Sequence, residues 1–423
     1  MLKLQGNSTT TISKNDPVTQ GGWTSNTPPP NGSSPIFDSP TILSSNIDTL
    51  VLTLDILWMD SKFLMYLKEM KELAIKIKNN YPVLFKGSTD SIDQKFLIKE
   101  HGSGGYEWIL HNNEYRLRIG SWLTLNSKPN VTIIINSETL WRLGLYNAVD
   151  NIIDLLKSQG GSIKTVKLSR VDLCADIILP ESMWSKELED FGVTRANYSG
   201  TRSFNRKLTG IDFGQGDILA RLYDKPAEIV AKKSKKNWMF DVWNLKEVPK
   251  DKKIIRVEFQ VRREIIKDLG LNEVSDLFIY YSNLWAYCTK KWLTFKNNPG
   301  KHQTHQRKVL DWWIVIQNGF LGVQDPKPLI RFKASKADEK QLLSQAMGLV
   351  SSLKALHFES ENIDSDHNIS IEEALFDVSK MSNDLGKTQA DFNQEIEKKR
   401  AKFVRSKDKL KEIHGERAKL SKN

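Results

Sequence analysis

Three segments in the middle of the chain alternate apolar and polar residues with the period of a β-strand. They lie at 169–177, 219–225 and 255–262. Successive side chains of a strand point to opposite faces, so each segment presents an apolar face and a charged face. The polar sets are Arg170, Asp172 and Asp176; Arg221, Tyr223 and Lys225; and Arg256, Glu258, Gln260 and Arg262. We expect one sheet to carry these groups on a single open surface.

The same periodicities predict an α+β fold of two βα(ββ)-type halves with mostly antiparallel sheets. The first half has predicted strands at 47–54, 106–110, 115–119 and 131–135, with helices near 64–73 and at 137–156. The second half has the three alternating strands, a strand near 203, a helix from 226 and helices within 263–295. The order of elements is alike in the two halves, although their sequences do not visibly repeat.

Amino-acid composition and the predicted elements together divide the chain into four regions. Residues 1–44 are rich in Ser, Thr, Asn, Gly and Pro, which predicts a disordered leader. We expect an N-terminal α+β half at 45–160 and a second, catalytic α+β half with a basic helical extension at 161–335. The remainder, 336–423, is predicted to be a helical, charged C-terminal region.

The charge of the chain favours an acidic partner. The formal net charge of +11 across 423 residues indicates nucleic acid first and an anionic membrane surface second, although a merely solvated basic surface is the alternative. The two cysteines cannot form a disulfide framework or a zinc ligand set, which favours a reducing, cytoplasmic setting. We find no signal peptide and no apolar run of about 18 residues, so we expect no membrane partner.

Basic residues near aromatic ones form candidate contacts to DNA. Phosphates attract cations and unpaired bases stack on aromatic rings, so such patches suit single-stranded DNA, although a solvated helix face also explains the lysines. Trp238 follows one of the patches. The predicted DNA-binding residues are Arg170, Arg202, Arg256, Lys232, Lys233, Lys235, Lys236, Arg307 and Lys308.

Tyr223 is the candidate nucleophile. A phenol with a pKa near 10 attacks phosphorus only when it is activated. Arg221 and Lys225 share its face and would favour the phenolate while holding a phosphate. The alternative is an aromatic ring that covers a sheet, with its hydroxyl in water.

Carboxylates on the same faces are candidate ligands for Mg²⁺ or Mn²⁺, which prefer hard oxygen donors. Asp172, Asp176 and Glu258 form this set, and Glu228 is either a further ligand or an ordinary residue of a helix start. The alternative for the strand carboxylates is cross-strand salt bridges, such as Asp172 with Arg256 or Glu258 with Arg170.

Taken in order, four motifs resemble the replication initiation factor family, also called Rep_trans. They are SRVDLCAD at 169–176, GTRS at 200–203, ARLYDKPAE at 220–228 and RVEFQ at 256–260. The resemblance covers about 45–335 and implies a degenerate HUH-like nicking fold. Better-known nicking relatives bind metal through a His-hydrophobe-His pair, which this chain lacks, so its site would consist of carboxylates.

The resemblance also implies an activity. A rolling-circle initiator of this family nicks one strand at an origin, keeps the 5′ phosphate on a tyrosine and leaves a free 3′ hydroxyl. By position, Tyr223 would be that tyrosine, and Asp172 and Glu258 would bind the metal with Asp176 and Glu228. The implied partners are origin DNA, double-stranded and single-stranded, a separate helicase and a second copy in a homodimer. A conjugative relaxase, a non-catalytic DNA-binding regulator and a packaging protein are the alternatives.

Overall fold

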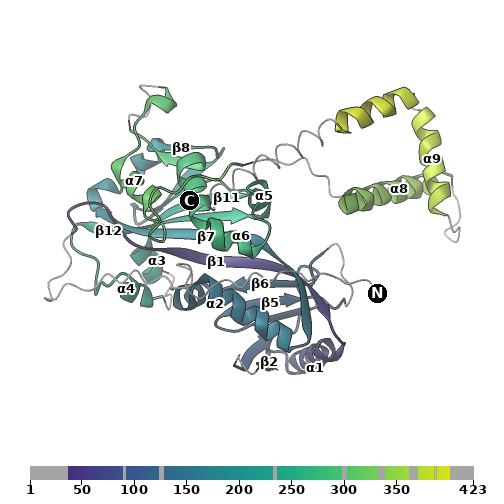
Figure 1. Ribbon diagram of the computed structural model, residues 1–423, viewed down its shortest axis with the longest axis horizontal. Coiled ribbons are helices and arrows are strands. Elements are labelled where there is room, and N and C mark those ends of the chain that lie inside the picture. The colour runs from purple at the N-terminus through teal and green to yellow at the C-terminus, as the bar shows by residue number, and fades with distance from the viewer. Residues whose placement is uncertain are drawn as a thin grey trace, which may run out of the picture. The chain divides into compact units, whose positions relative to one another are not determined.

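The computed structural model describes residues 37–88, 92–122, 128–231, 236–297, 303–331, 339–361, 370–384, 386 and 388–400 (Figure 1). The chain forms two compact units, Met1–Arg331 and Phe332–Asn423. The first unit ends at Arg331, close to the predicted boundary at 335. The second unit contains α8 (Glu339–Glu361) and α9 (Ile371–Asp384). No helix in the described ranges is long and apolar enough to cross a membrane.

One antiparallel sheet of eleven strands dominates the first unit, in agreement with the predicted mixture of helices and mostly antiparallel strands. The strand order is β2-β3-β4-β5-β6-β1-β7-β12-β11-β10-β9. The bounds are β1 (Thr41–Trp58), β2 (Tyr81–Phe85), β3 (Gln94–Ile98), β4 (Trp108–His111), β5 (Tyr115–Ile119), β6 (Val131–Ile135), β7 (Gly161–Pro180), β9 (Ser199–Phe204), β10 (Lys207–Phe213), β11 (Ile218–Asp224) and β12 (Lys252–Arg262). A separate two-stranded sheet pairs β8 (Gly192–Thr194) with β13 (Leu293–Phe295).

The two predicted halves share this sheet instead of forming sheets of their own. β1 and β7 are 18 and 20 residues long and pair along their lengths, so they join the halves at the centre. In each half the last strand returns beside the first: β6 pairs with β1, and β12 pairs with β7. The similar order of elements in the two halves therefore appears in the topology as well.

The face that carries the apolar residues of β1 and β7 holds the main core. Leu50 of β1 and Val171 of β7 are directly paired and completely buried there. The helices whose apolar residues join this core are α1 (Lys62–Ile77), α2 (Ser137–Ser158), α5 (Arg263–Asp268), α6 (Val274–Ala286) and α7 (Asp311–Asn318). Figure 1 shows α2 along the sheet beside β6 and β1. Within α2, Gly144 has a φ of 75°, a conformation that favours glycine, and the helix kinks there.

The opposite face is not the single open surface that we expected. Near one end of β7 and β12, a smaller core covers it with α3 (Lys225–Ala231) and α4 (Trp238–Val242). Cys174, Ile178 and Ile254 from the sheet pack there with Met239 and Trp243. Polar groups under this cover leave water and must find partners within the protein.

Several boundaries differ from the sequence prediction. β1 begins at Thr41, inside the predicted leader, and β2, β3 and β10 were not predicted. The rest of the leader at 1–36, the end of the chain from 401, and the predicted DNA-binding residues Lys232, Lys233 and Lys235 lie outside the described residues.

Candidate active site

Antiparallel register arranges the polar residues of the second half in rows across the sheet. Directly opposed residues of neighbouring strands share a face and stand about 5 Å apart at their Cα atoms. One row contains Asp212, Arg221, Glu258 and Cys174. The next row contains Arg202, Gly210, Tyr223, Arg256 and Asp176. The sheet thus places the predicted tyrosine among charged neighbours from four other strands.

The Tyr223 hydroxyl donates a hydrogen bond of 2.8 Å to Oε2 of Glu258. The other oxygen of the same carboxylate, Oε1, accepts a bond of 2.9 Å from Arg221. Glu258 is buried, Tyr223 is half-buried, and the Arg221 side chain is 32% exposed. The pair therefore lies at the border between the covered part of the face and its accessible part.

We expected nearby cations to lower the pKa of Tyr223 and so favour its phenolate, but the surroundings raise this pKa. Burial raises the pKa of the phenol well above its usual value, and the Glu258 carboxylate adds to this shift. Arg256 acts in the opposite direction and does not outweigh them. Lys225 lies 5.4 Å from the centre of the Tyr223 ring, but its ammonium pairs with Glu228 at 2.8 Å. The resting side chain is a neutral phenol with its proton directed at a carboxylate.

Asp172 lies on the same face as Glu258 and interacts with it electrostatically. Burial, aided by the charge of Glu258, raises the pKa of Asp172 to about 6 despite its hydrogen bonds from Arg170. Nε of Arg170 donates to Oδ1 of Asp172 at 2.7 Å, and Nη2 donates to Oδ2. Two carboxylates on the same face of the sheet thus share a poorly hydrated region, where a further positive charge would be stabilising.

Asp176 and Arg256 form a separate, fully buried ion pair. Nε and Nη2 of Arg256 donate to the two carboxylate oxygens at 2.7 and 2.8 Å. Trp243 and Ser44 each donate a further bond of 2.9 Å to Oδ2 of Asp176. Arg256 has no exposed surface, so its predicted role as a DNA contact is wrong. It is a buried counter-charge, because α4 covers this part of the face.

Asp48 is a second carboxylate that binds Arg256, and it was not predicted from the sequence. Its Oδ1 accepts bonds of 2.8 Å from both Arg256 and Ser137, and the Arg256 charge helps to hold its pKa below the usual range although burial opposes this. Simple alternation would place Asp48 on the apolar face with Leu50. The register shift between Ile47 and Thr49 inserts a bulge that turns it to the polar face. An acidic residue on the apolar parity of a strand is the signal that could have found it.

The four predicted metal ligands do not form one group. Among the described residues, no three His, Cys, Asp or Glu side chains gather as a metal-binding cluster. Asp176 is held by Arg256 and Glu228 by Lys225, while Asp172 and Glu258 remain near each other. Cross-strand salt bridges, the alternative explanation, do occur, between Arg221 and Glu258 and between Arg256 and Asp176, whereas Arg170 pairs with Asp172 of its own strand.

A further ion pair lies beside Tyr223 toward the sheet edge. Nη2 of Arg202 donates a 2.9 Å bond to Oδ1 of Asp212, a residue that the sequence did not single out because β10 was not predicted. The Arg202 side chain is 52% exposed. Gly210 stands directly opposite Tyr223, and a Cβ there would lie 2.7 Å from Nη2 of Arg202. The missing side chain of Gly210 therefore leaves room for the Arg202 guanidinium next to the tyrosine.

We expect Gly210→Ala to weaken DNA binding by several-fold while costing less than about 1 kcal/mol in stability. The added methyl meets only the end of a flexible side chain, so Arg202 can move away and the sheet need not deform. Binding to single-stranded DNA, measured by fluorescence anisotropy at two salt concentrations, checks this result. Gly348→Ala in α8, where a Cβ meets nothing within 4 Å, is the matched control. Equal binding by both variants would remove Arg202 from the DNA surface.

The remaining predicted DNA contacts are spread over the first unit. Arg170 is 35% exposed, Lys308 is exposed, and Lys236 and Arg307 are half-buried.

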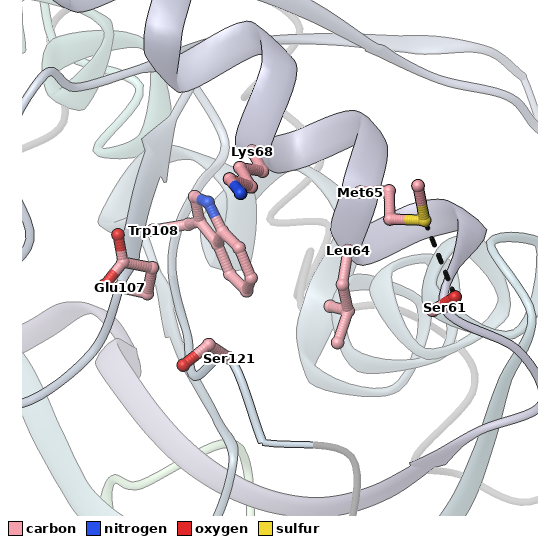
Figure 2. A pocket seen from close by; sticks show the side chains of 7 residues that line it. All are labelled: Ser61, Leu64, Met65, Lys68, Glu107, Trp108 and Ser121. Atoms are coloured by element: carbon pink, nitrogen blue, oxygen red, sulfur yellow. Dashed lines mark hydrogen bonds between the residues drawn. The ribbon is translucent and has the colours of Figure 1, made fainter.

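A hollow of about 340 Å³ lies beside α1, and Figure 2 shows Trp108 and Leu64 on opposite sides of it. None of the predicted site residues lines it.

Comparison with known proteins gives limited similarity. No family model matches the chain, and no curated protein does. Among solved structures, the rolling circle replication initiator protein from Geobacillus stearothermophilus is similar at 13% sequence identity with a TM-score of 0.39. The match covers 69% of this chain and 100% of that one. A functional argument for this chain therefore has to come from its own residues.

Proposed function

We propose that the chain is a tyrosine-dependent DNA nickase that initiates rolling-circle replication on a degenerate HUH-like fold. The observation that carries the proposal is the 2.8 Å bond from the Tyr223 hydroxyl to Glu258. A nucleophile within hydrogen-bond reach of a base, with the base held by a third group, is the general arrangement for nucleophilic catalysis. Arg221 is that third group, because it binds the other oxygen of Glu258.

The reaction follows from these contacts. The phenol oxygen of Tyr223 attacks the scissile phosphorus, and its proton passes to Oε2 of Glu258. A new bond joins the phenol oxygen to phosphorus, the bond from phosphorus to the 3′ oxygen breaks, and the leaving oxygen takes a proton to become a 3′ hydroxyl. The raised pKa of Tyr223 keeps the phenol neutral until the phosphate is in place, so a local base is required.

Cations on the accessible part of the face would bind the DNA. Arg202 lies in the row of Tyr223, beyond Gly210, and Arg221 lies two residues before Tyr223 on the same face of β11; both keep exposed surface. Guanidinium groups suit phosphate because their donors match its oxygens in pairs. These two arginines would hold the scissile phosphate, and Arg170 would bind a neighbouring one.

The predicted divalent ion would have a smaller set of ligands than expected. Mg²⁺ is commonly held by one or two carboxylates and keeps several waters, so Asp172 would be its main protein ligand once Arg170 releases an oxygen, while Glu258 serves as the base. Burial, and after it the charge of Glu258, raises the pKa of Asp172, and a cation would favour its ionised form. A bound Mg²⁺ or Mn²⁺ would supply charge neutralisation at the phosphate. Origin DNA, a separate helicase and a second copy of the chain remain the proposed partners.

Glu258→Gln tests the proposal. We expect the rate of nicking of supercoiled origin DNA to fall by about a hundredfold or more, because Gln cannot accept the phenol proton. Binding of the same DNA should stay within about threefold of the wild type, since Gln keeps the size of the side chain. The assay follows nicked circles on a gel in the presence of Mg²⁺ or Mn²⁺.

Glu264→Gln is the matched control, because Glu264 follows the same strand and its side chain is 67% exposed. Its nicking rate should equal that of the wild type. If Glu258→Gln nicks as fast as this control, Glu258 is not the base and the proposed mechanism fails.

A further inference from the structure

A second hollow of about 670 Å³ lies at the end of β11 that is remote from Tyr223. Its walls are the segment 195–198, the turn 214–217, Ile265 of α5, Trp292 at the end of the π-helical turn Tyr287–Trp292, and Arg331. Ile218, the first residue of β11, also lines it, five positions before Tyr223 and hence roughly 16 Å along the strand. The hollow is therefore distinct from the candidate active site.

Two guanidinium groups converge on this hollow. Arg195 is exposed and makes no ion pair with any described residue. Arg331 uses Nε and Nη2 to bind Oδ2 of Asp268 at 3.0 and 2.9 Å, which fixes its side chain in place. Both arginines act on the Tyr287 hydroxyl: burial raises the pKa of this group, and the charges of Arg331 and Arg195 oppose the shift. Both side chains line the same hollow, so an anion bound there can meet both cations.

That hydroxyl is itself unusual. Tyr287 is 1% exposed and does not itself line the hollow; its oxygen lies close to Arg331 but makes no hydrogen bond of normal length and angle with any described residue. Buried hydroxyls nearly always make such a bond, and an unmade one costs about 1–3 kcal/mol. The cations of Arg195 and Arg331, which do line the hollow, favour an anion inside it.

The rest of the hollow supplies a surface for an aromatic group. Tyr198 is 45% exposed and can stack on a base, whereas Trp292 is 6% exposed and closes the wall with its ring edge-on to Phe259. The turn that opens the hollow depends on Gly214, which has a φ of 81° and where a Cβ would lie 2.5 Å from the Ile218 carbonyl oxygen. Asp217 adds a carboxylate that can accept hydrogen bonds from amino groups.

We propose that this hollow binds a nucleotide, with its phosphate between Arg195 and Arg331 and its base against Tyr198. The volume lies within the range of small-molecule sites and far exceeds the needs of a lone phosphate ion. A nucleotide is also the common ligand that requires both an anion site and an aromatic platform. It can come from a free mononucleotide or from a unit of a DNA strand. The inference does not depend on strand cleavage.

Isothermal titration calorimetry tests this inference with the full chain carrying Tyr223→Phe, so that binding is measured without any cleavage. The probes are thymidine 5′-monophosphate, thymidine and a short 5′-phosphorylated oligothymidylate. We expect the phosphorylated probe to bind in preference to thymidine, and Arg195→Ala to weaken its binding by about tenfold, the loss of one charge-assisted hydrogen bond. Arg195→Lys should recover part of the affinity because it keeps the charge.

Arg116→Ala is the control, since it removes an exposed arginine from β5 in the other half of the sheet. It should leave every affinity within about twofold. Binding of the mononucleotide with this dependence on Arg195 identifies a free-nucleotide site, and the same dependence for the oligonucleotide alone identifies a strand contact. Equal affinities for Arg195→Ala and Arg116→Ala, or no binding of any phosphorylated probe, would overturn the proposal.

Discussion

Tyr223→Phe is expected to abolish the covalent protein–DNA adduct and to lower the nicking rate by at least about a thousandfold. The substitution removes the oxygen that forms the bond to phosphorus and keeps the ring, so the packing under α3 and α4 should persist. Removing a catalytic nucleophile costs about this much or more in enzymes where the remaining groups cannot replace it. The adduct is measured with end-labelled DNA on a denaturing gel, and DNA affinity should stay within about threefold.

Tyr146→Phe is the matched control for that experiment. Tyr146 lies in α2 and its ring packs on Phe278, with ring centres 5.6 Å apart, beside the main core, so losing its hydroxyl should leave adduct formation unchanged. An adduct that persists in Tyr223→Phe and disappears in Tyr146→Phe would identify Tyr146 as the nucleophile. An adduct that persists in both would mean that neither phenol is the nucleophile.

Arg256→Met is expected to lower the free energy of unfolding by about 3–5 kcal/mol. The substitution leaves the carboxylates of Asp176 and Asp48 buried without their counter-charge, and an isolated buried charge is far costlier than a paired one. Met keeps the length and much of the volume of the side chain, so a cavity contributes little to the loss. Urea unfolding followed by tryptophan fluorescence gives the change.

Two further variants separate charge from packing at this position. Arg202→Met alters an arginine that is 52% exposed and should change the free energy of unfolding by less than about 0.5 kcal/mol. Combining Arg256→Met with Asp176→Asn should recover part of the lost stability, because one unpaired carboxylate is removed. If Arg256→Met costs no more than Arg202→Met, the buried pair has no structural role and the assignment of Arg256 to the interior is wrong.

The alternation of apolar and polar residues along the chain was sufficient to predict most strands of the second half and the faces of their side chains. It assigned Asp172 and Glu258 to one face of their strands and Tyr223 to the face that carries Arg221, as the structure has them. It could not reveal which residues stand opposite one another. The bond from Tyr223 to Glu258 depends on the register between β11 and β12, which the sequence pattern within one strand does not determine.

The alternation of residues also could not predict which charged side chains of the sheet are buried. A charged residue on a strand reads as solvent-facing, and Arg256 was interpreted as a DNA contact on that ground. The short helix α4, with Met239 and Trp243, covers this part of the sheet and turns the same guanidinium into a buried counter-charge. Asp48 was missed for a related reason, since a bulge reverses the parity of the strand where it occurs.

The pairing of β1 with β7 limits how far the chain can be shortened. A fragment that starts after α2 would retain Tyr223, Glu258 and Arg221 but would lack Ser44 and Asp48, which lie in β1 and bind Asp176 and Arg256. It would also uncover the long edge of β7, a template for association with other chains. The residues of the proposed chemistry therefore all lie in the second half, but we expect a stably folded fragment to need β1 from the first half as well.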